Sequence, residues 1–315
     1  MNSFYECPFK YYCDNILKLD TYEDTFDTYI GSLCHYILSK IYTDNFDFDA
    51  AKKEFLETNS YQVTNENLLF QNKILEELKT AISYILSMQN VTKFNEIECE
   101  RKIETNINET KFVGIIDKIQ KYQNKIILID YKTGNPNTNL NNVIYGLDMQ
   151  LPIYLYLAKN TNKLTNVEIA GFYLQKILNN EINKDYKNSY LKLKENNLKL
   201  VGYSNNDIKI LNEFDPTYND STMIKSLKTT KNGFYTYSKV ISSDNINKIT
   251  NIIDNKIKEN ANDITNCKFD INPKRQNNDL LGCKYCKFND ICFRKEEDIV
   301  DVKEYKNLEF LESEE

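Results

Sequence analysis

The chain has 315 residues, of which 41% are hydrophobic and 12% aromatic, and it carries 40 Lys and Arg against 46 Asp and Glu. This length and hydrophobic content suffice for a sizeable core and exclude a wholly disordered chain. The single histidine excludes a zinc site with two histidine ligands. The net charge of −6 disfavours DNA binding over the whole surface but leaves room for a local basic channel.

The termini and the breaker residues indicate how the chain is organised. No stretch approaches about 18 consecutive apolar residues, and the N-terminus lacks the basic and apolar regions of a signal peptide. We therefore expect a cytoplasmic protein that does not enter a membrane. With only 8 Gly and 5 Pro and no linker-like segment, a single domain over residues 1–315 is expected.

The first part of the chain is predicted to be helical. Apolar residues at helical spacing predict a helix from Asp27 to Tyr42 and another from Glu66 to Met88, with Leu69 on the apolar face of the second. His35 lies about 140° around the first helix from the centre of its apolar stripe, so its side chain is expected to face away from the core.

The middle of the chain changes to the two-residue period of strands. The expected elements are strands at Phe94–Glu104, Phe112–Tyr122, Lys125–Tyr131 and Ala170–Ile177, and a helix at Asp148–Lys159. Residues 178–240 are polar and weakly periodic, and no element is predicted there. A last helix is expected from Ser242 to Ile264, with the Ser-Ser-Asp cluster as its N-cap. This order predicts an α/β fold with helices packed on a central sheet.

The densest group of catalytic residue types lies in one predicted hairpin. If Gln123 and Asn124 form a two-residue turn, Asp117 faces Asp130, because facing residue numbers then add to 247. Like charges placed opposite each other destabilise a sheet, so a cation is expected between them, and Lys132 follows on the same face as Asp130. Two carboxylates beside an ammonium group suit Mg²⁺ or Mn²⁺. The alternative is an ordinary exposed hairpin with a surface Asp–Lys pair.

These residues also carry a family resemblance. Gly114-x-x-Asp117 followed by Asp130-Tyr-Lys-Thr-Gly134 resembles the core of the PD-(D/E)XK nucleases, specifically their RecB-like branch. Gly31-Ser-Leu-Cys-His35 resembles the metal-binding histidine motif of that branch. Gln150-Leu-Pro-Ile-Tyr154 resembles its Gln-x-x-x-Tyr motif, and the i,i+4 spacing puts both side chains on one helix face.

The cysteines extend the resemblance. Three of them lie within ten residues, which indicates metal binding, and four thiolates suit either zinc or an iron–sulfur cluster. Cys7-Pro together with this cluster resembles the iron–sulfur ligands of AddB-type and CRISPR-adaptation nucleases. The resemblance implies a [4Fe–4S] cluster held by Cys7, Cys283, Cys286 and Cys292, with Cys13 as the alternative to Cys7. The four other cysteines are expected to be buried.

The resemblance implies a fold and a set of roles. The fold would be a restriction-endonuclease-like core with a central mixed sheet flanked by helices, and with the C-terminal cysteine cluster tied to the N-terminus. The implied ligands of Mg²⁺ or Mn²⁺ are His35, Asp117, Asp130 and the main-chain carbonyl of Tyr131. Lys132 would assist the attacking water, and Gln150 and Tyr154 would position the phosphate or the lysine. Glu98 and Glu100 are assigned to the strand surface.

The single domain is expected to have four parts: residues 1–93 with Cys7 and His35, 94–180 with the catalytic sheet, 181–266 with an insert and a helix, and 267–315 with the iron–sulfur segment and an acidic tail. The function implied is a metal-dependent DNA exonuclease in end processing, recombination and repair. Because the chain has no P-loop, it is not expected to unwind DNA by itself. It would be a free-standing relative, a piece of a larger protein, or a subunit that works with a separate helicase.

Three alternatives stay open. CRISPR-adaptation nucleases share these motifs but are usually more compact, whereas the stretch between Gln175 and Cys267 resembles AddB-type nucleases. A non-cleaving subunit could instead bind DNA ends through tyrosines that lie near lysines, as in the segment from Lys231 to Tyr237. The third alternative is a zinc-stapled scaffold in which the hairpin pair is incidental.

Overall fold

The computed structural model describes residues 1–315 except 21–24, 108–109, 161–166, 180–188, 307 and 313–315. A six-stranded mixed sheet forms its centre, with strand order β1-β2-β3-β4-β5-β8. The strands β3 and β4 are parallel, as are β5 and β8, and the other neighbours are antiparallel. The bounds are β1 Glu96–Ile107, β2 Thr110–Tyr122, β3 Lys125–Lys132, β4 Glu168–Lys176, β5 Leu200–Asn205 and β8 Val240–Ile241.

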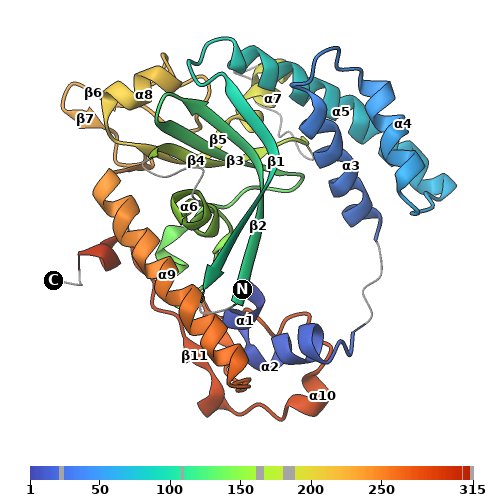
Figure 1. Ribbon diagram of the computed structural model, residues 1–315, viewed down its shortest axis with the longest axis vertical. Coiled ribbons are helices and arrows are strands. Elements are labelled where there is room, and N and C mark those ends of the chain that lie inside the picture. Colours follow the sequence, from blue (N-terminus) through green and yellow to red (C-terminus); the bar gives the residue numbers. More distant parts are fainter. Residues whose placement is uncertain (21–24, 108–109, 161–166, 180–188, 307, 313–315) are drawn as a thin grey trace.

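Helices cover both faces of this sheet (Figure 1). On β3, Ile127 and Ile129 pack with the core that includes residues of α3 (Phe26–Lys40) and α5 (Asn65–Gln89). Ile126 and Leu128, which alternate with them, pack with residues of α6 (Gln150–Asn160) and α9 (Ser243–Thr265). The central strand is therefore buried on both faces, and the expected central sheet flanked by helices is confirmed.

Most predicted elements are found within a few residues of their expected bounds. The side chain of Thr25 accepts a hydrogen bond from the third residue of α3, and that of Ser242 accepts one from Asn245 N, so α9 begins at the predicted N-cap. The prediction for Leu69 is wrong, because its side chain is 78% exposed. The buried residues of α5 begin only at Gln71, so the part of the helix before Gln71 extends past the elements that pack against the rest of it.

The polar stretch 178–240 contains elements that the sequence pattern does not predict. Among its described residues these are α7 Tyr190–Leu198, β5, α8 Ile208–Phe214, β6 Thr229–Thr230, β7 Gly233–Phe234 and the first residue of β8. Strand β5 escapes prediction because Ser204 and Asn205 are fully buried, which hides the usual alternation. Both are satisfied inside the core: Ser204 Oγ lies 2.7 Å from the Tyr173 hydroxyl, and Asn205 Nδ2 donates to Ile169 O at 3.0 Å.

The first and last parts of the chain lie side by side at the bottom of Figure 1. Phe9 N donates to Asp270 O at 3.2 Å, and the rings of Tyr12 and Phe269 stack with centroids 4.7 Å apart. The elements here are α1 Asn2–Glu6, α2 Pro8–Tyr11, the π-helix Tyr12–Ile16, β9 Lys274–Gln276, β10 Asp279–Leu280, α10 Asn289–Cys292 and β11 Val300–Asp301. The predicted tie between the C-terminal cysteine segment and the N-terminus is confirmed.

The remaining elements are α4 Phe48–Thr58 and the 3-10 helices Leu140–Tyr145, Glu296–Asp298 and Glu309–Leu311. None of the helices in the described ranges is both long and apolar enough to cross a membrane.

One buried lysine makes the stability of this core depend on pH. Lys118 on β2 is 3% exposed, and its Nζ donates to the Tyr42 hydroxyl at 2.6 Å. Burial lowers the pKa of Lys118 to about 7. The pKa of a lysine in an unfolded chain is about 10.4. Between pH 7 and this value, the unfolded chain therefore binds a proton that the folded chain does not.

We predict that raising the pH from 7 to 9 stabilises the parent relative to Lys118→Met by about 2 kcal/mol. The reason is that protonation of the unfolded lysine contributes less free energy to unfolding at the higher pH. Urea unfolding of both proteins at the two pH values measures this difference. Lys53→Met, at an exposed position of α4, should follow the parent at both. Parallel pH dependences for the parent and Lys118→Met would show that Lys118 is already charged in the fold.

Candidate metal-dependent active site

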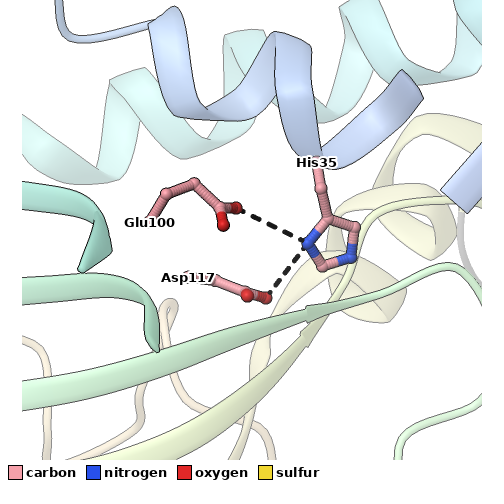
Figure 2. Close-up of side chains that lie close together, drawn as sticks. All are labelled: His35, Glu100 and Asp117. Carbon is pink, nitrogen blue, oxygen red and sulfur yellow. Dashed lines mark ion pairs between the residues drawn. The ribbon is translucent and has the colours of Figure 1, made fainter. Parts of the chain in front are cut away.

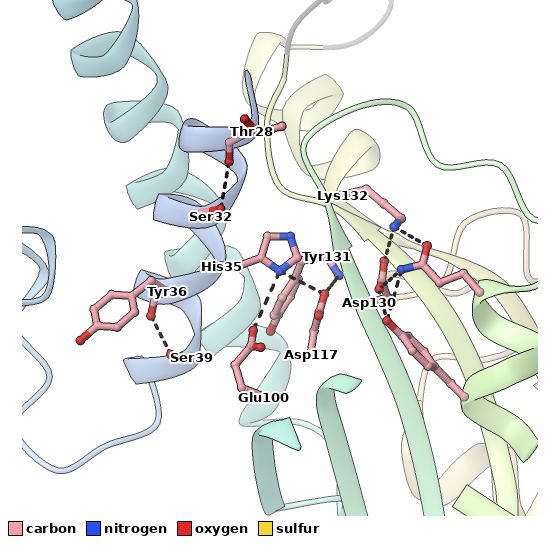
Figure 3. Close-up of polar contacts among 12 residues, drawn as sticks. Thr28, Ser32, His35, Tyr36, Ser39, Glu100, Asp117, Asp130, Tyr131 and Lys132 are labelled. Carbon is pink, nitrogen blue, oxygen red and sulfur yellow. Dashed lines mark hydrogen bonds and ion pairs between the residues drawn. The ribbon is translucent and has the colours of Figure 1, made fainter. Parts of the chain in front are cut away.

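The predicted catalytic residues of β2 and β3 meet the helices α3 and α6 at one end of the hairpin. Figure 3 shows His35 of α3 pointing toward Asp117 and Glu100, while Asp130 and Lys132 lie together on the other side of the hairpin. The site thus consists of two neighbouring polar groups. We call them the histidine group (His35, Glu100, Asp117) and the lysine group (Asp130, Lys132, Gln150, Tyr154).

The register of the hairpin is the predicted one. Tyr122 pairs with Lys125, and the ladder continues to Lys118 and Ile129, whose numbers add to 247. It ends one position before Asp117 and Asp130. Ile116 packs in the core on the α6 side, whereas Lys118 bonds Tyr42 on the α3 side, although alternation would put both on one face. The strand therefore changes face at Asp117.

This change of face separates the two aspartates. Asp117 Oδ2 accepts a hydrogen bond from Tyr131 N at 2.8 Å and lies 3.3 Å from His35 Nδ1. Asp130 instead joins the lysine group. The expectation of one cation between two facing carboxylates is therefore wrong. Each carboxylate has its own nitrogen partner, His35 for Asp117 and Lys132 for Asp130.

The histidine group has the geometry of a small cation site. His35 Nδ1 lies 4.0 Å from Glu100 Oε1, and one ligand atom from each of the three residues lies within 4.8 Å of the other two (Figure 2). One imidazole nitrogen and two carboxylate oxygens are donors that Mn²⁺ and Mg²⁺ accept. These three residues are therefore candidates to hold a divalent metal.

Glu100 is the member that sequence reasoning misses. The pairs Cys99 with Lys118 and Arg101 with Ile116 place Glu100 opposite Asp117, but Glu100 itself is absent from the ladder. Its φ of 47° lies in the left-handed region, which is uncommon for a residue other than glycine. The signal available in the sequence is the register of β1 against β2. That register begins at the pair Ile107 and Thr110, which lies beyond the predicted strand bounds at Glu104 and Phe112.

The lysine group surrounds a carboxylate that is only 1% exposed, that of Asp130. Its Oδ1 accepts hydrogen bonds from Gln150 Nε2 at 2.6 Å and from the Tyr154 hydroxyl at 2.9 Å. Lys132 Nζ lies 2.7 Å from Oδ2 and donates to Gln150 Oε1 at 2.5 Å. Gln150 and Tyr154 thus share one helix face, as their spacing predicts, and together they orient Asp130.

Gly114 allows α6 to come this close to β2. A Cβ atom at this position would lie 2.3 Å from Leu157 Cδ1, well inside van der Waals contact. The glycine of the Gly-x-x-Asp motif therefore acts through packing: it seats the helix that carries Gln150 and Tyr154 against the strand that carries Asp117.

The charges in both groups favour a bound cation. Burial lowers the pKa of His35, but the hydrogen bond with Asp117 and the charges of Asp117, Asp130 and Glu100 outweigh it and raise the pKa above its usual value. Burial and the charge of Asp117 raise the pKa of Asp130, although Lys132 opposes this. Asp130 Oδ2 lacks a hydrogen bond of ordinary geometry even though Lys132 Nζ is near. This crowded acidic site is chemically suited to a divalent ion.

A second group of possible ligands lies where the chain ends meet. Cys7 is buried against Gly282, where a Cβ atom would lie 3.1 Å from Cys7 Cβ, so Cys7 adjoins Cys283. Cys13 is also buried. Burial raises the pKa of Cys13, and the nearby Asp14, Cys286, Cys7 and Cys292 raise it further.

The expectation for the four remaining cysteines is only half right. Cys13 and Cys34 are buried, but Cys99 is half-buried and Cys267 is exposed. Cys267 follows the C-terminus of α9 and has a φ of 54°, so it lies in the turn that ends the helix and does not reach a core.

Comparison with known proteins defines the class. The family model of the PD-(D/E)XK nuclease superfamily matches residues 1–293, so the chain belongs to this superfamily of nucleases. These nucleases use a divalent metal, for which the histidine group is a candidate site.

The relatives are more particular. The chain is 26% identical to a subunit of the ATP-dependent helicase/deoxyribonuclease of Carboxydothermus hydrogenoformans, over 95% of this chain and 31% of the relative. The corresponding subunits from Oceanobacillus iheyensis and Clostridioides difficile are 24% and 25% identical, over 100% and 98% of this chain and 31% and 30% of theirs. The chain thus spans just under a third of these curated relatives. A solved structure, protein VC1899 from Vibrio cholerae, aligns with a TM-score of 0.24 at 12% identity, over 81% of this chain and 56% of that one.

We predict that Glu100→Gln weakens Mn²⁺ binding by at least about tenfold, because it removes one of the charged oxygens of the histidine group. Isothermal titration calorimetry measures the affinity without DNA. Glu98→Gln is the matched control, since Glu98 lies on the same strand but pairs with Arg101 and Lys121. An unchanged affinity in Glu100→Gln, equal to that of Glu98→Gln, would leave Glu100 outside the metal site.

Proposed function

We propose that this chain is a metal-dependent deoxyribonuclease that degrades DNA ends during recombination and repair. The observation that carries the proposal is the arrangement at the end of the hairpin, where the histidine group and the lysine group adjoin around Asp117 and Asp130. One group offers ligands for a divalent ion, and the other holds an ammonium group beside a buried carboxylate. Metal-assisted hydrolysis of a phosphodiester needs both functions.

His35, Glu100 and Asp117 would hold the ion, with Asp130 Oδ2 and the main-chain carbonyl of Tyr131 as further ligands. When bound, the divalent ion supplies a Lewis acid that polarises the phosphodiester and offsets the carboxylate charges. The histidine must be neutral to bind metal, so its proton leaves as the ion enters.

Lys132 is the residue that would act on the substrate. Its side chain is 31% exposed, so the ammonium group reaches solvent while Asp130 and Gln150 hold it in place. From there it would orient the attacking water and stabilise the negative charge that develops on the phosphate oxygens in the transition state. Tyr154 keeps Asp130 Oδ1 occupied and thereby leaves Oδ2 to face the lysine.

We further propose that Cys7, Cys283, Cys286 and Cys292 hold a [4Fe–4S] cluster. In support, Cys7 adjoins Cys283 next to Gly282, and Cys13 lies near Cys286 and Cys292, so thiols from both ends of the chain gather in one place. Four thiolates would also suit zinc, and metal content distinguishes the two. The cluster would tie both ends of the chain together, which supports a single domain over residues 1–315.

The names of the relatives support a division of labour. They combine a helicase and a deoxyribonuclease in the name of one subunit. We propose that this chain supplies the nuclease and that strand separation comes from a helicase subunit. These names also favour the AddB-type interpretation over the CRISPR-adaptation alternative.

Cleavage of end-labelled single-stranded and duplex DNA by anaerobically purified protein with Mn²⁺ or Mg²⁺ tests the activity. We predict that Asp130→Ala lowers the rate by at least about 100-fold, because it removes the group that orients Lys132. Asp220→Ala, at a position with a 77% exposed side chain, should cleave like the parent. Full activity in Asp130→Ala would place the active site elsewhere. DNA binding without cleavage by the parent would support the non-cleaving alternative.

The cluster is tested by metal content and by protection of the N-terminus. We predict that Cys286→Ser loses iron and acid-labile sulfide and that trypsin then cleaves within residues 1–20 faster, because the contacts at Cys7 are released. Cys267→Ser, at an exposed cysteine, should keep both iron and protection. Zinc in place of iron in the parent would establish the zinc alternative.

A further inference from the structure

A groove beside the active site has no part in the chemistry described above. It has a volume of about 610 Å³ and runs along the segment that follows the small β6–β7 hairpin. Tyr235 and Tyr237 line it, with ring centroids 5.1 Å apart and ring planes 17° apart. Their side chains are 39% and 54% exposed, so this stacked pair presents aromatic surface to solvent.

The groove adjoins the pocket at Lys132. That pocket, of about 160 Å³, is lined by Lys132 and Gln150, and it shares Asn137, Thr138 and Asn139 with the groove. Lys239 holds the two walls together, since its Nζ donates to Thr138 O at 2.6 Å and to Thr138 Oγ1 at 2.8 Å. A chain molecule leaving Lys132 along these shared residues therefore reaches the tyrosines.

Charge distinguishes this path from its neighbour. Lys239 lines the tyrosine groove and no acidic residue does, and residues 221–243 around it hold three more lysines, of which Lys228 pairs with Asp220. A second depression, of about 410 Å³, also begins at Asn137 and Asn139, but it is lined by Glu6, Asp148 and Glu304 and by no lysine or arginine. A polyanion would be repelled from the acidic depression and drawn to the tyrosine groove.

We propose that Tyr235 and Tyr237 form a stacking platform for the single-stranded part of a DNA substrate whose scissile phosphate lies at Lys132. This inference rests on the proposed function, because it takes Lys132 as the point of cleavage. Aromatic side chains stack on any unpaired base, and lysines such as Lys231 contact the phosphates between bases. Bases within a duplex are already stacked on one another, so the platform would favour single strands.

Fluorescence anisotropy with a labelled oligothymidylate, in EDTA to prevent cleavage, tests the platform. We predict that the full chain carrying Tyr235→Ala and Tyr237→Ala binds this probe about tenfold more weakly but binds a duplex of equal length as the parent does. Tyr235→Phe with Tyr237→Phe should restore binding, because the ring faces remain. Tyr190→Ala, at a 59% exposed tyrosine of α7, is the matched control.

Salt dependence separates stacking from charge. The alanine pair should shift the affinity at every salt concentration without changing the slope of log affinity against log salt, whereas Lys231→Gln should reduce that slope by about one. Parent-like binding of oligothymidylate by the alanine pair would overturn the platform, and so would an equal loss of duplex binding or no single-strand binding by the parent.

The cleavage assay keeps the two proposals apart. If the parent cleaves DNA and Asp130→Ala does not, but the alanine pair binds single strands normally, the platform fails while the nuclease stands. If the parent does not cleave DNA but binds single strands, and the alanine pair loses that binding, the platform stands and the nuclease fails.

Discussion

Repulsion between carboxylates is the constraint on which the site depends. The registers of β1, β2 and β3 place Glu100, Asp117 and Asp130 at facing positions of three adjacent strands. Like charges in such positions weaken a sheet. The ladder is interrupted there: Glu100 adopts a left-handed conformation, and β2 changes face at Asp117. The backbone strain at Glu100 and the change of face thus fall at the candidate site, at one point of an otherwise regular sheet.

The two layers of helices match this division. The α3 layer brings His35 to Asp117, and α6 on the opposite face brings Gln150 and Tyr154 to Asp130. Each carboxylate therefore has its polar partners on the face of the sheet toward which its side chain points. Because β3 is buried on both faces, the sheet holds these partners in fixed positions while Lys132 at its end remains accessible. A rigid support with one reachable cation is what charge stabilisation in a transition state needs.

The surface beyond the site continues the same electrostatic logic. Acidic side chains line one depression next to the pocket at Lys132, and the stacked tyrosines with Lys239 line the other. Along the proposed path a polyanion would meet few carboxylates despite the net charge of −6, because charges interact mainly within about a Debye length of 10 Å. The C-terminal segment from Cys267 lies against the N-terminal part of the chain, where Asp270 accepts a hydrogen bond from α2 and Phe269 stacks on Tyr12 of the π-helix.

The sequence by itself determined the strongly periodic elements, the β2–β3 register and the motif residues. Helical and strand periods are local signals, and a two-residue turn leaves only one register. Tertiary structure alone decided three things. Strand β5 is hidden in the sequence because its buried polar residues find partners only across the sheet. Glu100 reaches His35 only through the register of β1. Asp117 and Asp130 part because helices distant in sequence pack on opposite faces, which no local pattern records.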